Sequence, residues 1–355
     1  MLIAPHPDDE SLACSIVLQR AVRDGATIRV IYATDGDDNP WPQRVLGRKW
    51  HVTDADRRRW GKLRRLEALS ALRVLGVDRQ GTDFLALPDQ GLTTLLRTDC
   101  RSAIERAVEI IRSWSPTHLL IPSVSDTHPD HSALAVILRL ALAEISEPRI
   151  SVSSYAVHGK SRAFSARAEP LLQSLAETET KVQAILCHTS QIMLSRKRFL
   201  SYANRPERLA KLDPIEPTVA DGPIRAIKRN KNVLNVAIRV SPKLIRSGET
   251  ALILVGRDLN GAVRCLRTRL PVRSSEIHMF ECDSPCRLIA NYRGNAFAGE
   301  FTIPIDGFSE AHVLFVKLER RSLFFDEAGW LEIAPTIRAQ PADSMVQPEP
   351  SFAVR

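Results

Sequence analysis

Short apolar runs and amphipathic stretches alternate along the first half of the chain. The apolar runs resemble buried strands and occupy residues 2–4, 26–33, 81–85, 116–122 and 151–157. Between them, apolar residues recur at helical spacing and predict helices over 12–22, 57–75, 101–113 and 133–145, with a later one over 169–186. This alternation indicates an α/β fold over residues 1–202, with a Rossmann-like, doubly wound and mostly parallel sheet.

The pattern changes after residue 202. Residues 203–224 contain prolines without a clear period and predict a linker. Short β-rich runs then follow one another, separated by turn signals such as Ser247-Gly248 and Asn260-Gly261. We predict a smaller all-β, antiparallel, sandwich-like domain over 225–334 and a disordered tail over 335–355.

Length, charge and cysteine content narrow the classes of protein to consider. A chain of 355 residues is too long for one ordinary hydrophobic core, which suggests two domains. No run of about 18 apolar residues is present, so we expect no transmembrane segment. The net charge is +8, but the basic run 57–65 carries only Trp60 as an aromatic residue, so we expect no nucleic-acid binding. The six cysteines form no disulfide framework, which favours a cytoplasmic location. The short first strand leaves open a native start upstream of Met1.

Two clusters carry the candidate chemistry. His6-Pro7-Asp8-Asp9-Glu10 follows the first apolar run, and we expect Pro7 in the first turn of the next helix. His128-Pro129-Asp130-His131 repeats this strand–loop–helix context. Two histidines and a carboxylate with an open fourth position are typical of catalytic zinc. Either cluster alone could simply cap a helix, but both together at strand ends predict a metal site. His51, His118 and His158 stand outside any motif and are expected to be structural.

Together the two clusters resemble the LmbE-like, or PIG-L, family of zinc-dependent N-deacetylases. The resemblance covers residues 1 to about 200. Its further landmarks are Thr34-Asp35-Gly36, Arg64-Arg65-Leu66-Glu67, Leu87-Pro88-Asp89, Lys181 and His188-Thr189-Ser190-Gln191.

The resemblance implies a role for each matching position. The metal, Zn²⁺ or another divalent ion, would be held by His6, Asp9 and His131, with Asp8 as the general base. His128 would stabilise the oxyanion, and Asp130 would orient His128. Substrate contacts would come from Arg64, Asp89 and His188. A tyrosine that some relatives place before the second cluster is absent, and Ser125-Asp126-Thr127 stands there instead.

The function implied is removal of the N-acetyl group from an N-acetylglucosamine-type unit of a glycoconjugate or small glycoside. Two alternatives remain: a zinc amidase acting on another N-acyl or thiol-conjugate substrate, and a carbohydrate-binding protein on a retired hydrolase fold. A lipid-linked substrate would bring peripheral membrane contact, and the oligomeric state stays open. The polar loop 37–53 is long enough to form a lid or rim. The β-rich part supplies no catalytic group, so a fragment ending near residue 222 is expected to keep metal and activity.

Overall fold

The structure is a computed structural model that describes residues 1–145, 150–159, 161–212, 222–242, 247–281, 287–322 and 324–336. Its α/β half contains β1 (Leu2–Ala4), α1 (Asp9–Ala13), α2 (Ser15–Arg23), β2 (Val30–Thr34), α3 (Pro40–Gly47), α4 (Asp54–Val74), η1 (Arg79–Gly81), β3 (Thr82–Leu87), α5 (Leu92–Thr98), α6 (Cys100–Trp114), β4 (His118–Pro122), α7 (Pro129–Leu142), β5 (Ser151–Tyr155), α8 (Arg162–Arg167), β6 (Glu169–Leu171), α9 (Leu175–Cys187), α10 (Thr189–Leu200) and β7 (Glu207–Lys211).

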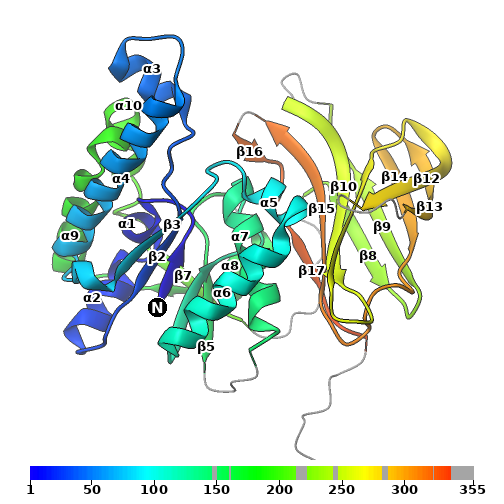
Figure 1. Cartoon of the computed structure of the whole chain (residues 1–355), viewed down its shortest axis with the longest axis horizontal. Coiled ribbons are helices and arrows are strands. Elements are labelled where there is room, and N and C mark those ends of the chain that lie inside the picture. Colours follow the sequence, from blue (N-terminus) through cyan, green and yellow to red (C-terminus); the bar gives the residue numbers. More distant parts are fainter. Residues whose placement is uncertain are drawn as a thin grey trace, which may run out of the picture.

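The described strands of this half form one sheet in the order β3-β2-β1-β4-β5-β7-β6 (Figure 1). Strands β1 to β5 are parallel, and the antiparallel β7 and β6 close one edge. Alternate residues face opposite cores: Leu2 and Ala4 pack toward α1, α2, α4 and α9, whereas Ile3 packs toward α5, α6 and α7. The predicted α/β class with a mostly parallel sheet is confirmed.

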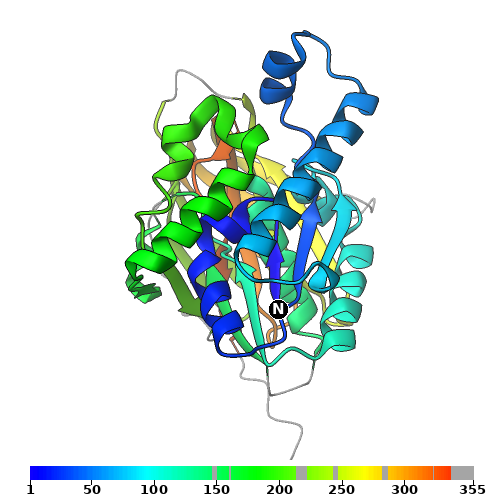
Figure 2. The same ribbon diagram turned by 90° about the vertical axis from the view of Figure 1, so that its left-hand side faces the viewer.

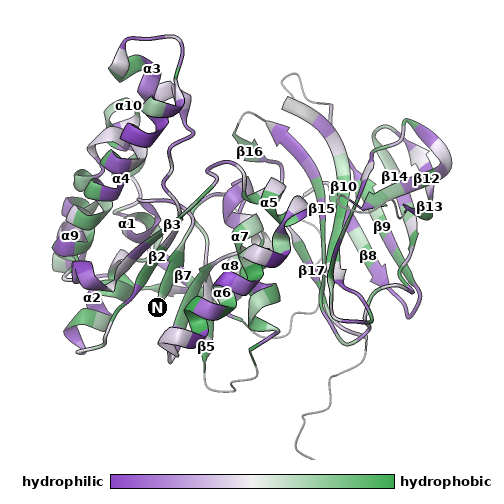
Figure 3. Ribbon diagram, in the orientation of Figure 1, coloured by the Kyte–Doolittle hydropathy of each residue, from purple (hydrophilic) through white to green (hydrophobic). Residues whose placement is uncertain are grey.

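Helices cover both faces of this sheet. Figure 2 shows α9 and α10 beside α4 on the outer face. Figure 3 shows that the central strands are mainly hydrophobic, while the outer side of α4 is largely hydrophilic. Among the described helices, none combines the length and the hydropathy required to cross a bilayer.

Several predicted boundaries are wrong in detail. Pro7 precedes the first helix, which starts at Asp9. The polar loop 37–53 contains α3, which begins after the N-cap Asn39 and carries Pro40 in its first turn. Residues 169–171 form β6 instead of the start of a helix, and residues 207–211, assigned to the linker, form β7. The sequence does not predict β7 because it lies in a proline-rich segment, and only its pairing with β5 identifies it as a strand. Most of the remaining linker and of the predicted tail lies outside the described residues.

The β half is a second, antiparallel sheet. It contains β8 (Ile224–Arg229), β9 (Val233–Arg239), β10 (Ser247–Arg257), β11 (Val263–Arg269), β12 (Arg273–Glu281), β13 (Arg287–Asn295), β14 (Ala298–Pro304), β15 (Leu314–Ser322), β16 (Phe325–Asp326) and β17 (Leu331–Ile333). The strand order is β16-β15-β10-β11-β12-β13-β14-β9-β8, with β17 on β15. The all-β antiparallel prediction is confirmed. The described strands curve as one continuous sheet around a core that includes Leu254, Phe301 and Val316.

The two halves share a hydrophobic core. Ile253, Val255 and Phe315 point away from the β half's own core and pack with residues of α5, α6 and α7. Helix α7 is consequently buried along nearly its whole circumference between the two sheets. Polar contacts add to this interface: Arg257 Nη2 donates to Leu140 O at 2.9 Å, and Arg139 pairs with Glu332. The halves therefore form one packed body through α7.

Candidate active site

Both candidate clusters lie at the carboxyl ends of neighbouring parallel strands. The chain turns between β1 and α1 through His6 and Asp8, and between β4 and α7 through His128. Because β1 pairs with β4 where the strand order reverses direction, the two loops meet at the switch point of the sheet. Open α/β sheets bind ligands at this position.

Three donor atoms from these loops form a compact triangle. His6 Nδ1 lies 3.1 Å from His131 Nε2, and Asp9 Oδ2 lies 3.5 Å from the first and 3.4 Å from the second. A tetrahedral zinc ion with bonds of about 2.0–2.1 Å places its ligand atoms about 3.3–3.5 Å apart. Two of the three distances lie in this range and the third is slightly shorter, so the predicted ligand set is close enough to hold one metal ion.

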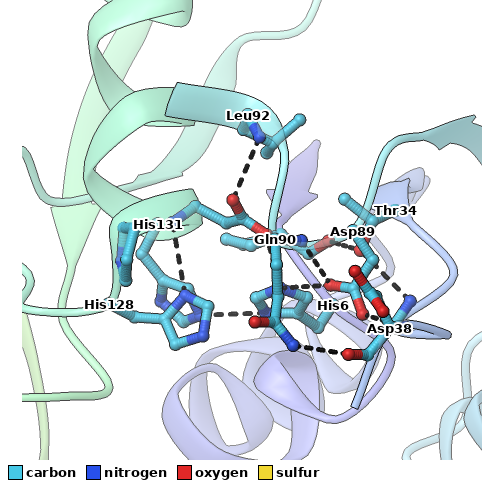
Figure 4. A network of polar contacts seen from close by, with 12 residues as sticks. His6, Thr34, Asp38, Asp89, Gln90, Leu92, His128 and His131 are labelled. Carbon is cyan, nitrogen blue, oxygen red and sulfur yellow. Dashed lines mark hydrogen bonds and ion pairs between the residues drawn. The ribbon is translucent and has the colours of Figure 1, made fainter. Parts of the chain in front are cut away.

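The charges around His6 also suit a cation. Its Nε2 lies 3.2 Å from Asp89 Oδ1 and 3.3 Å from Asp130 Oδ2 (Figure 4). Burial favours the neutral ring, but the contacts with Asp130, Asp89 and Asp9 raise the pKa of His6 well above its usual value. Burial likewise opposes ionisation of Asp9, yet the nearby His131 and His6 lower the pKa of Asp9 below its usual range. The carboxylates around His6 therefore favour a positive charge at this position, which is the electrostatic property of a metal site.

Two buried carboxylates hold the candidate histidine donors. Asp126 Oδ2 lies 3.2 Å from His131 Nδ1 and accepts the backbone N–H of His158 at 3.0 Å. Asp130 accepts the N–H groups of Gln90 at 2.6 Å and Leu92 at 3.1 Å, and its carboxylate faces His6. Asp130 thus contacts His6, whereas the sequence predicted that it would orient His128. Only the backbone N–H of Asp130 reaches His128 Nδ1, at 3.3 Å.

Asp8 stands beside the donor triangle and is held by Arg64. Arg64 Nη2 lies 3.0 Å from Asp8 Oδ2 and donates to Pro7 O at 2.7 Å, while Nη1 donates to Gly36 O at 2.8 Å. Gly36 has φ +63°, and a Cβ there would lie 1.6 Å from Arg64 Nη1, so this close approach requires glycine. Burial raises the pKa of Asp8 to about 6 against the opposing charge of Arg64. Arg64, predicted to contact substrate, also fixes the Asp8 loop.

His188 lies behind this loop. Its side chain is 1% exposed, and its Nε2 lies 2.8 Å from Glu10 Oε1 and 3.1 Å from Ser11 Oγ. The structure therefore brings His188 to the back of the site, although the sequence predicted a substrate contact. Lys181, from the same landmark, pairs with Glu207 of β7 at 2.7 Å.

A cleft of about 320 Å³ opens above the donor triangle. Its walls include the predicted residues His6, Asp8, Asp9, Arg64, Asp89 and His128. They also include Asn39 and Trp41, so segment 37–53 contributes to the rim, as expected.

His158 in the cleft wall was assigned to the structural histidines from the sequence. Its ring centroid lies 5.0 Å from that of His131 and 5.6 Å from that of His128, and burial lowers its pKa to about 4. The available signal was its position just after strand β5, the neighbour of β4 in the sheet.

Comparison with known families agrees with this geometry. Residues 1–142 match the family described as PIG-L: GlcNAc-PI de-N-acetylase. All three candidate metal donors, Asp8 and His128 lie inside the matched segment, whereas His158 and His188 lie beyond it.

Similar proteins are deacetylases of a glucosamine-containing inositol compound. The 1D-myo-inositol 2-acetamido-2-deoxy-alpha-D-glucopyranoside deacetylase of Mycobacterium avium is 28% identical over 145 residues, covering 37% of this chain and 47% of that protein. The deacetylase 2 of that name from Saccharopolyspora erythraea is 32% identical over 165 residues, covering 42% and 57%. The chain thus spans about half the length of these relatives.

Solved structures overlap with a larger part of the chain at lower identity. N,N'-diacetylchitobiose deacetylase from Pyrococcus horikoshii is 20% identical with a TM-score of 0.45, covering 59% of this chain and 82% of that one. The 4-carboxy-2-hydroxymuconate hydratase of Pseudomonas putida KT2440 is 17% identical with a TM-score of 0.46, covering 62% and 98%.

Proposed function

We propose that the protein is a zinc-dependent N-deacetylase that acts on N-acetylglucosamine-type sugar units. The observation that carries this proposal is the donor triangle of His6, Asp9 and His131, with the separately held carboxylate of Asp8 in the same cleft. The PIG-L match and the names of the relatives support the class of substrate. Cys14 and Cys187 form no disulfide, which is compatible with the cytoplasmic location that we also propose.

The proposed reaction divides its work between Asp8 and His128. Zinc held by His6, Asp9 and His131 would supply Lewis acidity for the attacking water and the amide carbonyl. Asp8 removes the proton from that water, because its raised pKa of about 6 makes it a stronger base than an exposed carboxylate. Asp8 then gives this proton to the amine nitrogen as the C–N bond breaks, so that acetate and the free amino sugar leave.

His128 is suited to stabilise the oxyanion. Burial lowers the pKa of His128 well below its usual value, so the ring is neutral near pH 7. Its Nδ1 accepts the backbone N–H of Asp130, which leaves the ring proton on Nε2. His128 can therefore donate a hydrogen bond from Nε2 to the developing negative charge. Arg64 keeps Asp8 oriented throughout.

The test combines metal content with amine release. Zinc-loaded wild-type protein should release amine from methyl N-acetylglucosaminide. Asp8→Asn should retain zinc but lose about 10²–10⁴-fold in rate, whereas His131→Ala should purify with clearly less zinc. Asp24→Asn, which changes an exposed carboxylate at the end of α2, is the matched control and should resemble wild type. Zinc binding without amine release from any N-acyl sugar would instead favour the binding-protein alternative.

A further inference from the structure

The β half reaches into the candidate active site. Phe324 and Phe325, at the start of β16, line the cleft together with the histidines of the α/β half. The Phe325 ring centroid lies 5.1 Å from that of His158 and 5.7 Å from that of His128. The guanidinium of Arg198 from α10 lies 5.9 Å from the centroid of the same ring. The β half, from which we expect no catalytic group, thus still contributes to the wall of the cleft.

The segment that carries Phe325 is firmly docked. Asp326 N donates to Thr127 O at 2.9 Å, directly before the His128 cluster. The fully buried Lys317 lies 2.5 Å from Asp326 Oδ2 and donates to Ser132 Oγ of α7 at 3.3 Å. These contacts fix the position of Phe325 relative to the His128 cluster, so its ring forms a permanent part of the cleft wall.

The cleft lining combines two kinds of side chain. Beside the carboxylates and imidazoles described above, it contains apolar residues of three segments, namely Trp41, Leu194, Phe199, Phe324 and Phe325. Trp41 is 52% exposed and Leu194 is 46% exposed, so part of this apolar lining is open to solvent. Large exposed apolar residues that continue a site typically mark a surface that binds ligand.

We propose that the cleft takes an N-acyl amino sugar bearing an apolar ring or chain near the amide, and that Phe325 determines this specificity. The inference rests on the proposed deacetylase function and narrows its substrate class. A sugar with only hydroxyl substituents would leave Trp41 and Leu194 in water, whereas an apolar group would cover them while Phe325 packs against it. The apolar group can belong to the aglycone or to the acyl chain, because both adjoin the scissile amide region.

Equilibrium binding to zinc-loaded protein tests the inference without requiring turnover. In the aglycone arm, calorimetry compares phenyl with methyl β-D-glucosaminide, which carry no amide. In the acyl arm, the N-hexanoyl and N-acetyl forms of methyl glucosaminide are compared on Asp8→Asn protein, with further substitutions made in that background. We expect a preference of about tenfold for the apolar ligand in at least one arm, the size of one well-packed aromatic contact.

The substitutions identify the residue responsible. Phe325→Ala should reduce the preference to about twofold or less, and Phe325→Leu should keep part of it because an apolar side chain remains. Phe297→Ala, which removes an exposed phenylalanine outside the cleft lining, should keep the full preference. Equal binding of the paired ligands in both arms, or a preference that survives Phe325→Ala, would overturn the inference. Failure of the proposed function has a different signature, because it appears as absent amine release whatever the binding preference.

Discussion

Asp126 offers a direct test of how the chain prepares its metal site. We expect Asp126→Asn to weaken zinc binding by about 10–100-fold, because losing the carboxylate behind a histidine ligand typically has an effect of this size. The structure supports that magnitude. His131 Nδ1 and Asp126 Oδ2 are 3.2 Å apart, and both side chains are 0% exposed. A contact with a charged partner contributes about 1.5–3 kcal/mol, and about 1.4 kcal/mol corresponds to tenfold in affinity. Asp126 Oδ2 accepts the N–H groups of Val157 and His158, and Oδ1 accepts that of His128. Asparagine keeps only one acceptor oxygen, so a lower thermal stability is expected beside the weaker zinc binding.

The measurement is a titration of metal-free protein with zinc in competition with a chromophoric chelator, accompanied by a thermal unfolding curve for each variant. Asp8→Asn is the matched control. It also removes one buried carboxylate near the site, but Asp8 is paired with Arg64 and not with a candidate donor. The affinity of Asp8→Asn should stay within a few-fold of wild type. An unchanged affinity in Asp126→Asn, or an equal loss in both variants, would refute the idea that Asp126 acts by positioning His131.

Three further predictions concern the docking of the β half. Lys317→Met removes the nearer partner of the buried Asp326 and leaves only Arg321, at 3.8 Å, so it should destabilise the protein by about 3 kcal/mol. The double substitution Lys317→Met, Asp326→Leu should recover most of this loss, as measured by chemical denaturation of both variants. Gly329→Ala should lower the midpoint of thermal unfolding, because a Cβ there would lie 2.3 Å from Val124 O; a midpoint equal to that of wild type would contradict the close approach. The fragment 1–222 should be poorly soluble or unstable, since it uncovers the face of α7 that packs on the β half. A soluble fragment with wild-type zinc affinity would contradict this prediction and would show that the α/β half folds without the β half.

The two metal clusters were predictable because each is contiguous in sequence. His6 to Glu10 and His128 to His131 each combine ligand types in one short stretch, and the strand before each places them at one sheet edge. The parallel sheet that joins them followed from the hydropathy alternation alone. Local pattern and global fold agree here, so sequence reasoning reaches the donor set.

Other site residues depend on contacts that a local pattern does not contain. Asp126 lies in a polar loop and gains its role only because His131 folds back over it. His158 becomes part of the cleft because β5 pairs with β4. Phe325 follows Asp126 by nearly two hundred residues and belongs to a different sheet. The packing of the β half against α7 was not predictable for the same reason: Ile253 and Val255 look like ordinary alternating strand residues, and only the structure reveals which core each one joins.

The burial of α7 on both sides has a consequence for the order of events during synthesis. Helix α7 ends at Leu142, but the residues that cover its second face, such as Phe315 and Trp330, are synthesised much later. At about 5–20 residues per second, translation of that interval takes on the order of ten to forty seconds. During this time the nascent chain carries the His128 loop on a helix with one apolar face uncovered. We therefore expect stable zinc capture only after the last strands emerge from the ribosome, with a need for chaperone protection until then.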